Sequence, residues 1–242
     1  MGENTFKRYE KKYYLTKEQK EGLEAIILKH MKLDSFCEKN GSYLIRNIYY
    51  DTDHEDLARI STSKPLFKEK LRVRKYGTFN DGKDDYYLEI KRKSNKVVYK
   101  RRVKMTWNEI NDFVSRREIP KRDGYLDKQV LKELDYFLSI YKVEPKSFIS
   151  YMRVAYFDCS DPSFRLTFDN NIFSRREGFS FDDDTKETEL IDDDHYLMEV
   201  KVSTAIPLWF TRGLSSLNIY PCSFSKYGTD FKLKKEGNLL WY

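Results

Sequence analysis

The sequence predicts an α+β protein built on an eight-stranded antiparallel β-barrel, with helices packed outside it. The main observation is that roughly eight segments alternate apolar and charged residues, as Leu71-Arg72-Val73-Arg74 does, and this period of two is typical of a strand with one packed face. Short polar turns such as Ser94-Asn95 separate several of these segments, as in hairpins. Closing the sheet removes its exposed edges, and a barrel of this size encloses at most one small ligand. An open sheet with its charged face in water fits the same periodicity.

The first half of the chain is expected to hold most of the strands. Capping boxes at Thr16 with Gln19 and at Thr106 with Glu109 each open a helix. A short helix is also expected from near Asp53. The first helix carries an apolar stripe made by Leu23, Ile26, Ile27 and Met31. The expected strands cover residues 6–14, 43–51, 67–76, 86–93 and 96–105.

The second half is expected to alternate helices and strands. Apolar residues at helical spacing predict a helix over residues 127–141, and Pro207 begins a shorter one that reaches about residue 217. The acidic stretch with Asp182-Asp183-Asp184 lacks EF-hand spacing, which predicts a solvated loop. Residues 222–232 form a closing segment. The expected strands cover residues 148–158, 164–169 and 195–203.

At 242 residues the chain is one large domain or two small ones. Because it has no internal repeat and no long linker, we expect residues 1–242 to form a single packed domain. Aromatic residues make up 16% of the chain, which is typical of a globular protein. Three cysteines far apart indicate reduced thiols and a cytoplasmic location. The N-terminus lacks the apolar run of a signal peptide, and no segment is apolar enough to span a membrane. The net charge of +6 suits an anionic ligand, but 39 acidic residues argue against a general nucleic-acid coat.

The charged positions of the expected strands concentrate the positive charge. Twelve of these residues are basic and four are acidic, so the set carries +8 while the whole chain carries +6. If they face inward, the resulting tunnel must stay wet or hold an anion, because uncompensated buried cations are prohibitively costly. The set consists of Arg8, Glu10, Lys12, Arg72, Arg74, Glu89, Lys91, Lys93, Lys100, Arg102, Arg153, Arg165, Asp169, Glu199, Lys201 and Lys226.

Phosphate is the anion that this set suits best. Arginine and lysine match phosphate oxygens, and the carboxylates are either ion-paired spacers or ligands for Mg²⁺ or Mn²⁺. The chain has no P-loop, no kinase glycine loop and no Rossmann fingerprint, and its three histidines are isolated. Phosphoryl transfer tolerates this lack of general bases, because positioning and electrostatics supply most of the catalysis.

Six short motifs follow one another along the chain: Phe6-Lys7-Arg8-Tyr9-Glu10-Lys11-Lys12-Tyr13, Leu71-Arg72-Val73-Arg74-Lys75-Tyr76-Gly77, Leu88-Glu89-Ile90-Lys91-Arg92-Lys93, Ser150-Tyr151-Met152-Arg153, Leu197-Met198-Glu199-Val200-Lys201 and Ser223-Phe224-Ser225-Lys226-Tyr227. Together they resemble the catalytic domain of the vacuolar transporter chaperone (VTC) polyphosphate polymerases, which are triphosphate tunnel metalloenzymes of the CYTH-like superfamily. The resemblance covers essentially the whole chain. It implies a tunnel of eight antiparallel strands that takes a nucleoside triphosphate and Mn²⁺ or Mg²⁺.

The resemblance and the inward set together assign expected roles. Glu199 is implied as the main metal ligand, with Glu10 and Glu89 as candidates to assist it. Lys100 is expected on the phosphate path only in one register of its hairpin. If the register shifts by one residue, Arg101 or Arg102 takes that position. The residues expected to act on the reacting phosphates are Lys12, Arg72, Arg74, Lys91, Arg153, Arg165 and Lys226. Further phosphate or nucleotide contacts are expected from Arg8, Lys93, Lys100, Arg102, Lys201 and Ser225.

Two positions depart from the pattern of the resemblance. Hydrolytic tunnel enzymes begin with a Glu-x-Glu-x-Lys motif, and here Arg8 takes the first position. This exchange removes a metal ligand and adds a phosphate-binding cation, which favours holding a chain over activating water. Ser223 stands where the eukaryotic enzymes often have a further lysine, and one cation fewer weakens the grip on a long product.

The expected activity is that of a metal-dependent phosphotransferase, an ATP-dependent polyphosphate polymerase that moves the γ-phosphate of ATP onto a growing polyphosphate chain. The expected partners are ATP and inorganic polyphosphate and not nucleic acid, and the sequence identifies no membrane protein that would receive the product. One alternative is a metal-dependent tripolyphosphatase or nucleoside triphosphatase. Another is a non-catalytic module that binds polyphosphate or nucleotides. Single-stranded RNA binding is disfavoured by the diluted net charge.

Overall fold

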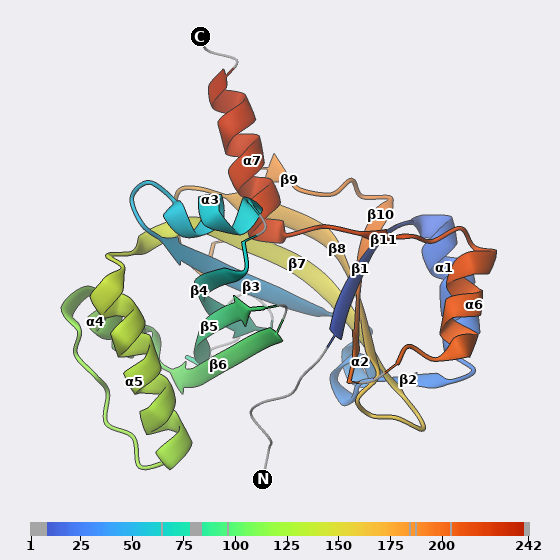
Figure 1. Ribbon diagram of the computed structural model, residues 1–242, viewed down its shortest axis with the longest axis horizontal. Helices are drawn as coiled ribbons and strands as arrows, with labels where there is room; N and C mark the ends of the chain where they lie inside the picture. The colour runs from blue at the N-terminus through green and yellow to red at the C-terminus, as the bar shows by residue number, and fades with distance from the viewer. Residues whose placement is uncertain are drawn as a thin grey trace.

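The computed structural model describes residues 9–63, 65–77, 84–95, 97–183, 185–186, 188–203 and 205–239 (Figure 1). Its strands are β1 (Tyr9–Thr16), β2 (Met31–Leu33), β3 (Tyr43–Asp51), β4 (Phe67–Tyr76), β5 (Tyr86–Ser94), β6 (Val97–Met105), β7 (Glu144–Asp158), β8 (Arg165–Arg175), β9 (Thr188–Glu189), β10 (His195–Val202) and β11 (Pro221–Cys222). Its helices are α1 (Lys17–Ile27), α2 (Ser35–Asn40), α3 (Asp56–Thr62), α4 (Trp107–Arg116), α5 (Tyr125–Ile140), α6 (Leu208–Ser216) and α7 (Lys226–Leu239).

One large antiparallel sheet forms the centre of the molecule. Hydrogen-bonded neighbours follow the order β11-β1-β10-β8-β7-β3-β4-β5-β6, with β2 beside β7 and β9 beside β8. The long strands are those expected from the alternating pattern, so a mixed fold with a large antiparallel sheet is confirmed. The closed eight-stranded barrel is not confirmed. Among the described strands, β6 and β11 are the two ends of the order, and no ladder joins them.

The short strand β11 lies on the edge of β1 that closure of the barrel would use. In this ladder Lys12 pairs with Cys222 and Tyr13 pairs with Pro221. Side chains still cross the remaining gap, because Nζ of Lys91 on β5 lies 3.5 Å from Oε2 of Glu10 on β1. The two arms of the sheet therefore meet through side chains and not through hydrogen-bonded backbone.

The helices cover the sheet in three groups (Figure 1). Helices α4 and α5 share one core with the apolar residues of β4, β5 and β6, in which Phe113 and Phe137 are fully buried. Helices α1 and α6 share a second core with β1, β8 and β10, which includes Leu23 and Phe210. Helices α3 and α7 pack on the opposite face of the sheet, where Tyr227 joins residues of β3 and β7. The helices thus leave part of this opposite face for a site.

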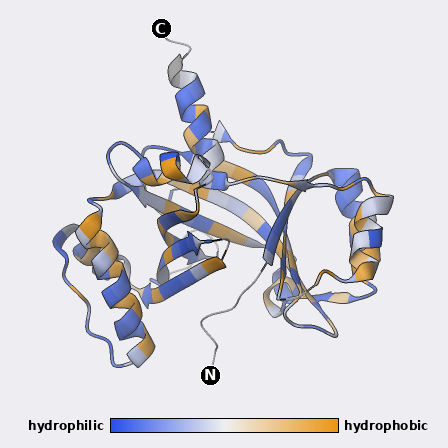
Figure 2. Cartoon of the chain, in the orientation of Figure 1, coloured by the Kyte–Doolittle hydropathy of each residue, from blue (hydrophilic) through white to orange (hydrophobic). Residues whose placement is uncertain are grey.

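The alternation along the strands decides which side chains reach each face. On β4, Leu71 and Val73 are buried in the core beneath α4 and α5. Arg72 and Arg74, which alternate with these two residues, point to the opposite face of the sheet, because successive side chains of a strand alternate in direction. In Figure 2 the strands accordingly show hydrophilic and hydrophobic bands in alternation.

Both predicted capping boxes are present at the starts of α1 and α4. The first helix is shorter than expected, since α1 ends at Ile27 and Met31 begins β2, which pairs with β7. The closing segment, residues 222–232, contains Cys222 of β11 and the first half of α7. Residues 6–8 of the expected first strand, with Arg8, and also Lys96 and Asp184, lie outside the described residues. In the described part of the chain no helix is both long and apolar enough to cross a membrane.

Candidate functional site

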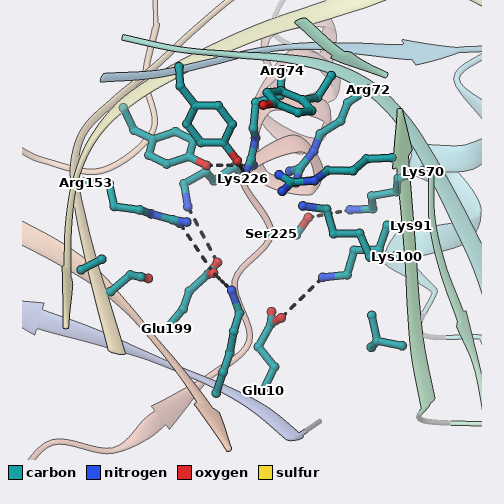
Figure 3. Close-up of a pocket in the computed structure, with 18 of the residues that line it drawn as sticks. Glu10, Lys70, Arg72, Arg74, Lys91, Lys100, Arg153, Glu199, Ser225 and Lys226 are labelled. Atoms are coloured by element: carbon teal, nitrogen blue, oxygen red, sulfur yellow. Dashed lines mark hydrogen bonds and ion pairs between the residues drawn. The ribbon is translucent and has the colours of Figure 1, made fainter. Parts of the chain in front are cut away.

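A cavity of about 780 Å³ lies between the arms of the sheet, and the start of α7 contributes to its wall. Among the described residues, its lining has twelve basic side chains but only two carboxylates, Glu10 and Glu199. Such an excess of cations requires water or an anion in the space. Figure 3 shows several of these side chains, among them Arg72, Arg153 and Lys226, converging from different elements. The basic lining residues are Lys12, Lys70, Arg72, Arg74, Lys91, Lys100, Arg101, Arg102, Arg153, Arg165, Lys201 and Lys226.

The structure brings most of the predicted site residues to this one cavity, and their chemical roles stay predictions. Arg8 lies outside the described residues, while Lys93 and Glu89 are described but do not line the cavity. The hairpin register pairs Lys91 with Lys100, which places Lys100 in the wall as expected. The predicted residues that line the cavity are Glu10, Lys12, Arg72, Arg74, Lys91, Lys100, Arg102, Arg153, Arg165, Glu199, Lys201, Ser225 and Lys226.

Glu89 is an ion-pair partner behind the wall of the cavity. It is 1% exposed, and its carboxylate lies 2.7 Å from Nη2 of Arg72 and 2.8 Å from Nζ of Lys100. Burial alone would raise the pKa of Glu89, but Arg72, Arg74 and Lys100 outweigh burial and hold the pKa far below its usual value. Glu89 therefore remains charged and orients two cations of the cavity. This placement does not bring it together with the other two predicted metal ligands.

Arg74 is held by neutral groups. Its Nε donates to Oδ1 of Asn47 at 2.9 Å, and its two terminal nitrogens donate to the hydroxyls of Tyr76 at 3.2 Å and Tyr151 at 3.1 Å. These contacts fix the guanidinium without cancelling its charge. Arg74 thus leaves a full positive charge at the cavity wall.

A second ion-pair group lies on the facing arm. Arg153 donates to both carboxylate oxygens of Asp169, at 2.6 and 2.7 Å, and Lys226 donates to Asp169 at 2.6 Å. Asp169 is fully buried. Such a two-pronged arginine contact fixes geometry as well as charge. Asp169 thereby orients one cation from β7 and one from α7 toward the cavity.

Glu199 lies among cations within the cavity. Its carboxylate is 3.1 Å from Nζ of Lys12 and 3.7 Å from Arg153. Burial alone would raise the pKa of Glu199, but Lys12, Lys226 and Lys201 outweigh burial and lower it well below its usual value. The opposite holds for Lys12, where burial lowers the pKa and Glu199 and Glu10 raise it above its usual value. Both groups are therefore charged near neutral pH.

The carboxylates fit a metal only in combination with a ligand. No group of three or more His, Cys, Asp or Glu residues is arranged to hold a metal within the described ranges. Glu10 and Glu199 do lie on the paired strands β1 and β10, with Glu10 opposite Lys201 and Lys12 opposite Glu199. Glu10 makes only the longer contacts, 3.8 Å to Lys12 and 3.5 Å to Lys91. This donor set suits Mg²⁺ or Mn²⁺, since such ions are often held by one or two carboxylates plus substrate phosphates.

Sequence reasoning missed several lining residues. Lys70 lies on β4 with the same direction as Arg72 and Arg74, so the alternation used for those two arginines already pointed to it. Burial, followed by the nearby charges of Lys12 and Lys91, lowers the pKa of Lys70 to about 7. The other missed residues include the lining tyrosines, which a charge pattern cannot reveal: Tyr43, Tyr49, Tyr76, Tyr87 and Tyr151.

Comparisons with known proteins agree with this architecture. A family model described as the VTC domain matches residues 7–233. A solved structure from Bacillus halodurans, of a protein with the provisional description of adenylate cyclase, has a TM-score of 0.53 and 15% sequence identity and covers 93% of this chain and 96% of its own. At that identity the likeness shows a shared fold alone. No curated protein matches the chain. Because the family model spans nearly all of the sequence that builds the basic cavity, the chain belongs to the VTC domain family.

Proposed function

We propose that this protein is an ATP-dependent polyphosphate polymerase, which adds the γ-phosphate of ATP to a growing inorganic polyphosphate chain. Membership of the VTC domain family associates the chain with polyphosphate or nucleotide chemistry. The observation that carries the proposal is the cavity of about 780 Å³ with twelve basic side chains and two carboxylates. A linear polyanion neutralises such a wall along its length.

Residues from both arms would hold the triphosphate. Arg72, Arg74 and Lys91 reach the cavity from β4 and β5, and Arg153 and Arg165 reach it from β7 and β8. Their opposing placement lets phosphate oxygens on two sides be contacted at once. Cations fixed in advance by ion pairs and tyrosines stabilise charge on a transferring phosphoryl group without reorganising.

The transfer step requires no side-chain base. A terminal oxygen of polyphosphate forms a bond to the γ-phosphorus of ATP, while the bond from that phosphorus to the β–γ bridging oxygen breaks and ADP leaves with the electron pair. The attacking oxygen is already ionised near neutral pH. Ser225 and Lys226, at the start of α7, line the cavity and would orient this oxygen.

The metal requirement belongs to the same proposal. Glu199, with Glu10 beside it on β1, would hold Mn²⁺ or Mg²⁺ together with the triphosphate. When bound, the ion neutralises charge on the phosphate oxygens. Glu89 is given no part in this, because Arg72 and Lys100 already occupy its carboxylate.

A product assay tests the proposal directly. Purified protein is incubated with ATP and Mn²⁺, and products are resolved on a polyphosphate gel while ADP and orthophosphate are measured. A long polymer formed together with ADP is the expected result. If orthophosphate is the sole phosphate product, the protein is a hydrolase and not a polymerase. Glu10 would then be the candidate carboxylate that activates water. No turnover at all would indicate a binding module.

A further inference from the structure

Lys70 differs from every other described lysine of the cavity wall in its partners. The other five each have a carboxylate within 4 Å: Lys12 and Lys201 have Glu199, Lys91 has Glu10, Lys100 has Glu89, and Lys226 has Asp169. Lys70 instead donates to the hydroxyl of Ser225 at 2.8 Å. Among the described lining lysines it is therefore the one without an anionic partner in the protein.

The partner hydroxyl is held by the first turn of α7. Ser225 directly precedes this helix, and its Oγ also accepts a hydrogen bond from the backbone N–H of Gly228 at 3.2 Å, as an N-cap residue does. Gly228 permits this close approach, since a Cβ there would lie 3.2 Å from Oγ of Ser225. With both acceptor positions of the oxygen used, the hydroxyl proton is left to donate to a ligand in the cavity.

The charged groups with the largest effect on the pKa of Lys70 are all cationic. Lys68 and Arg72 flank it on β4, Lys91 is its cross-strand partner on β5, and Lys12 acts on it from β1. From α7, Ser225 contacts it and the ring of Tyr227 lies 5.9 Å from its Nζ. Of the carboxylates on the neighbouring strands, Glu10 on β1 is engaged by Lys91 and Lys12, and Asp51 on β3 is engaged by Tyr227. An ammonium in this position therefore lacks the negative charge that it requires.

We propose that Lys70 and Ser225 form an additional phosphate-binding position at the start of α7, where a bound phosphate oxygen supplies the anionic partner that Lys70 lacks. The inference rests on the proposed function in taking a phosphate chain as the ligand. It adds a consequence that a permanently charged side chain, such as an arginine, does not have: the chain binds together with a proton. The lowered pKa of Lys70, about 7, agrees with this, because a bound anion raises the pKa of a lysine.

Binding of inorganic tripolyphosphate, measured by calorimetry without metal and without turnover, tests this position. Titrations at pH 8 in buffers of different ionisation enthalpy give the number of protons taken up. Wild type is expected to take up about half a proton to one proton more than Lys70→Met. Between pH 6 and pH 8.5, the affinity of wild type for tripolyphosphate should fall about tenfold or more in excess of the fall seen for Lys70→Met. Titration of tripolyphosphate itself affects both proteins equally and so cancels in this comparison. Lys70→Arg, which keeps its charge, should lose this additional pH dependence while retaining affinity.

The matched control is Lys68→Met. Lys68 is two residues earlier on the same face of β4, donates to the backbone oxygen of Ser61 at 3.2 Å and does not line the cavity. This variant deletes the same charge and should keep the wild-type proton uptake.

Equal proton uptake by wild type and Lys70→Met, or equal losses of affinity in the Lys68 and Lys70 variants, would overturn the inference. If Lys70→Met does not fold, the deciding comparison is between wild type and Lys70→Arg. The inference then requires that Lys70→Arg takes up fewer protons than wild type when tripolyphosphate binds. Failure of polymer synthesis alone would leave the binding result standing.

Discussion

Glu199 is the carboxylate on which the proposed chemistry most depends. It lies in the cavity, 3.1 Å from Lys12, and cations keep its pKa well below the usual value. A buried carboxylate that is so fully compensated remains ionised and can bind a metal near neutral pH.

Replacing this carboxylate should separate turnover from binding. In Glu199→Gln, metal-dependent turnover is expected to fall about 100-fold or more, because the charge that holds the metal is removed. Tripolyphosphate binding without metal should be retained or become tighter, since one repulsive charge has gone. Steady-state kinetics and calorimetry measure the two effects, with the exposed Glu118→Gln as control. Undiminished turnover would show that another residue carries the metal.

Glu89 predicts a dependence of stability on pH. Its folded pKa is held below the usual 4.5, so its ion pairs with Arg72 and Lys100 contribute fully above about pH 4.5, and this contribution is lost as the pH falls below that value. Glu89→Gln should therefore lower the free energy of unfolding by about 3 kcal/mol or more at pH 7. The difference from wild type should shrink toward pH 3.5.

Urea unfolding in metal-free buffer at the two pH values measures this difference. The control is Asp85→Asn, because Asp85 forms an exposed pair with Lys104 at 2.8 Å and should change stability little at either pH. A Glu89→Gln protein as stable as wild type at pH 7 would contradict the assigned ion pairs.

At the scale of elements, two predicted site residues reach the cavity at the start of helix α7: Lys226 is its first residue and Ser225 directly precedes it. The hydroxyl of Tyr227 in its first turn donates to Oδ2 of Asp51 at 2.8 Å. Asp51 also accepts from the backbone N–H groups of Leu57 and Ala58 in α3, each at 2.9 Å. One buried carboxylate therefore connects α3, β3 and α7, and through them it sets the position of Ser225.

Tyr227→Phe removes only the bond between this carboxylate and α7. The variant is expected to lose about 1.5 to 3 kcal/mol of stability, as for other hydrogen bonds to charged groups. Its tripolyphosphate affinity should also weaken, because the start of α7 is less firmly placed. Tyr136→Phe, on an exposed part of α5, provides the control. Unfolding curves that coincide for the two variants would argue against this role for Asp51.

For the whole molecule, the distribution of charge matters more than its sum. The net charge is only +6, yet twelve basic side chains line one cavity. Charges gathered in a concave space focus the field on ligands small enough to enter it. Because the lining residues sum to +10 and the whole chain to +6, the rest of the chain carries a net charge of −4, which does not favour a nucleic acid.

This distribution predicts selective binding that weakens with salt. Tripolyphosphate affinity should fall steadily as NaCl is raised from 0.05 to 0.5 M, because salt screens the cations at the cavity. A single-stranded RNA oligonucleotide should bind far more weakly at each concentration. Calorimetry or a fluorescent competitor gives both affinities. Equal affinities for RNA and tripolyphosphate would contradict a site confined to the cavity.

Much of the fold and of the site composition could be predicted from local pattern. The alternation of Leu71, Arg72, Val73 and Arg74 decides which side chains reach the cavity, because a strand turns successive residues to opposite faces. The same rule includes Lys70. The capping box at Thr16 with Gln19 likewise begins α1 where expected, since its hydrogen bonds join residues close in sequence.

By itself, then, the sequence determined the strands, their charged faces and the concentration of cations that suits a polyphosphate. The tertiary structure decided what these residues do to one another. The pairing of Lys12 with Cys222 that leaves the barrel open, the capture of Glu89 by Arg72 and Lys100, and the approach of Lys70 to Ser225 depend on how the strands and α7 are arranged in space. Periodicity describes one strand at a time, whereas these contacts exist only when strands and helix are packed together.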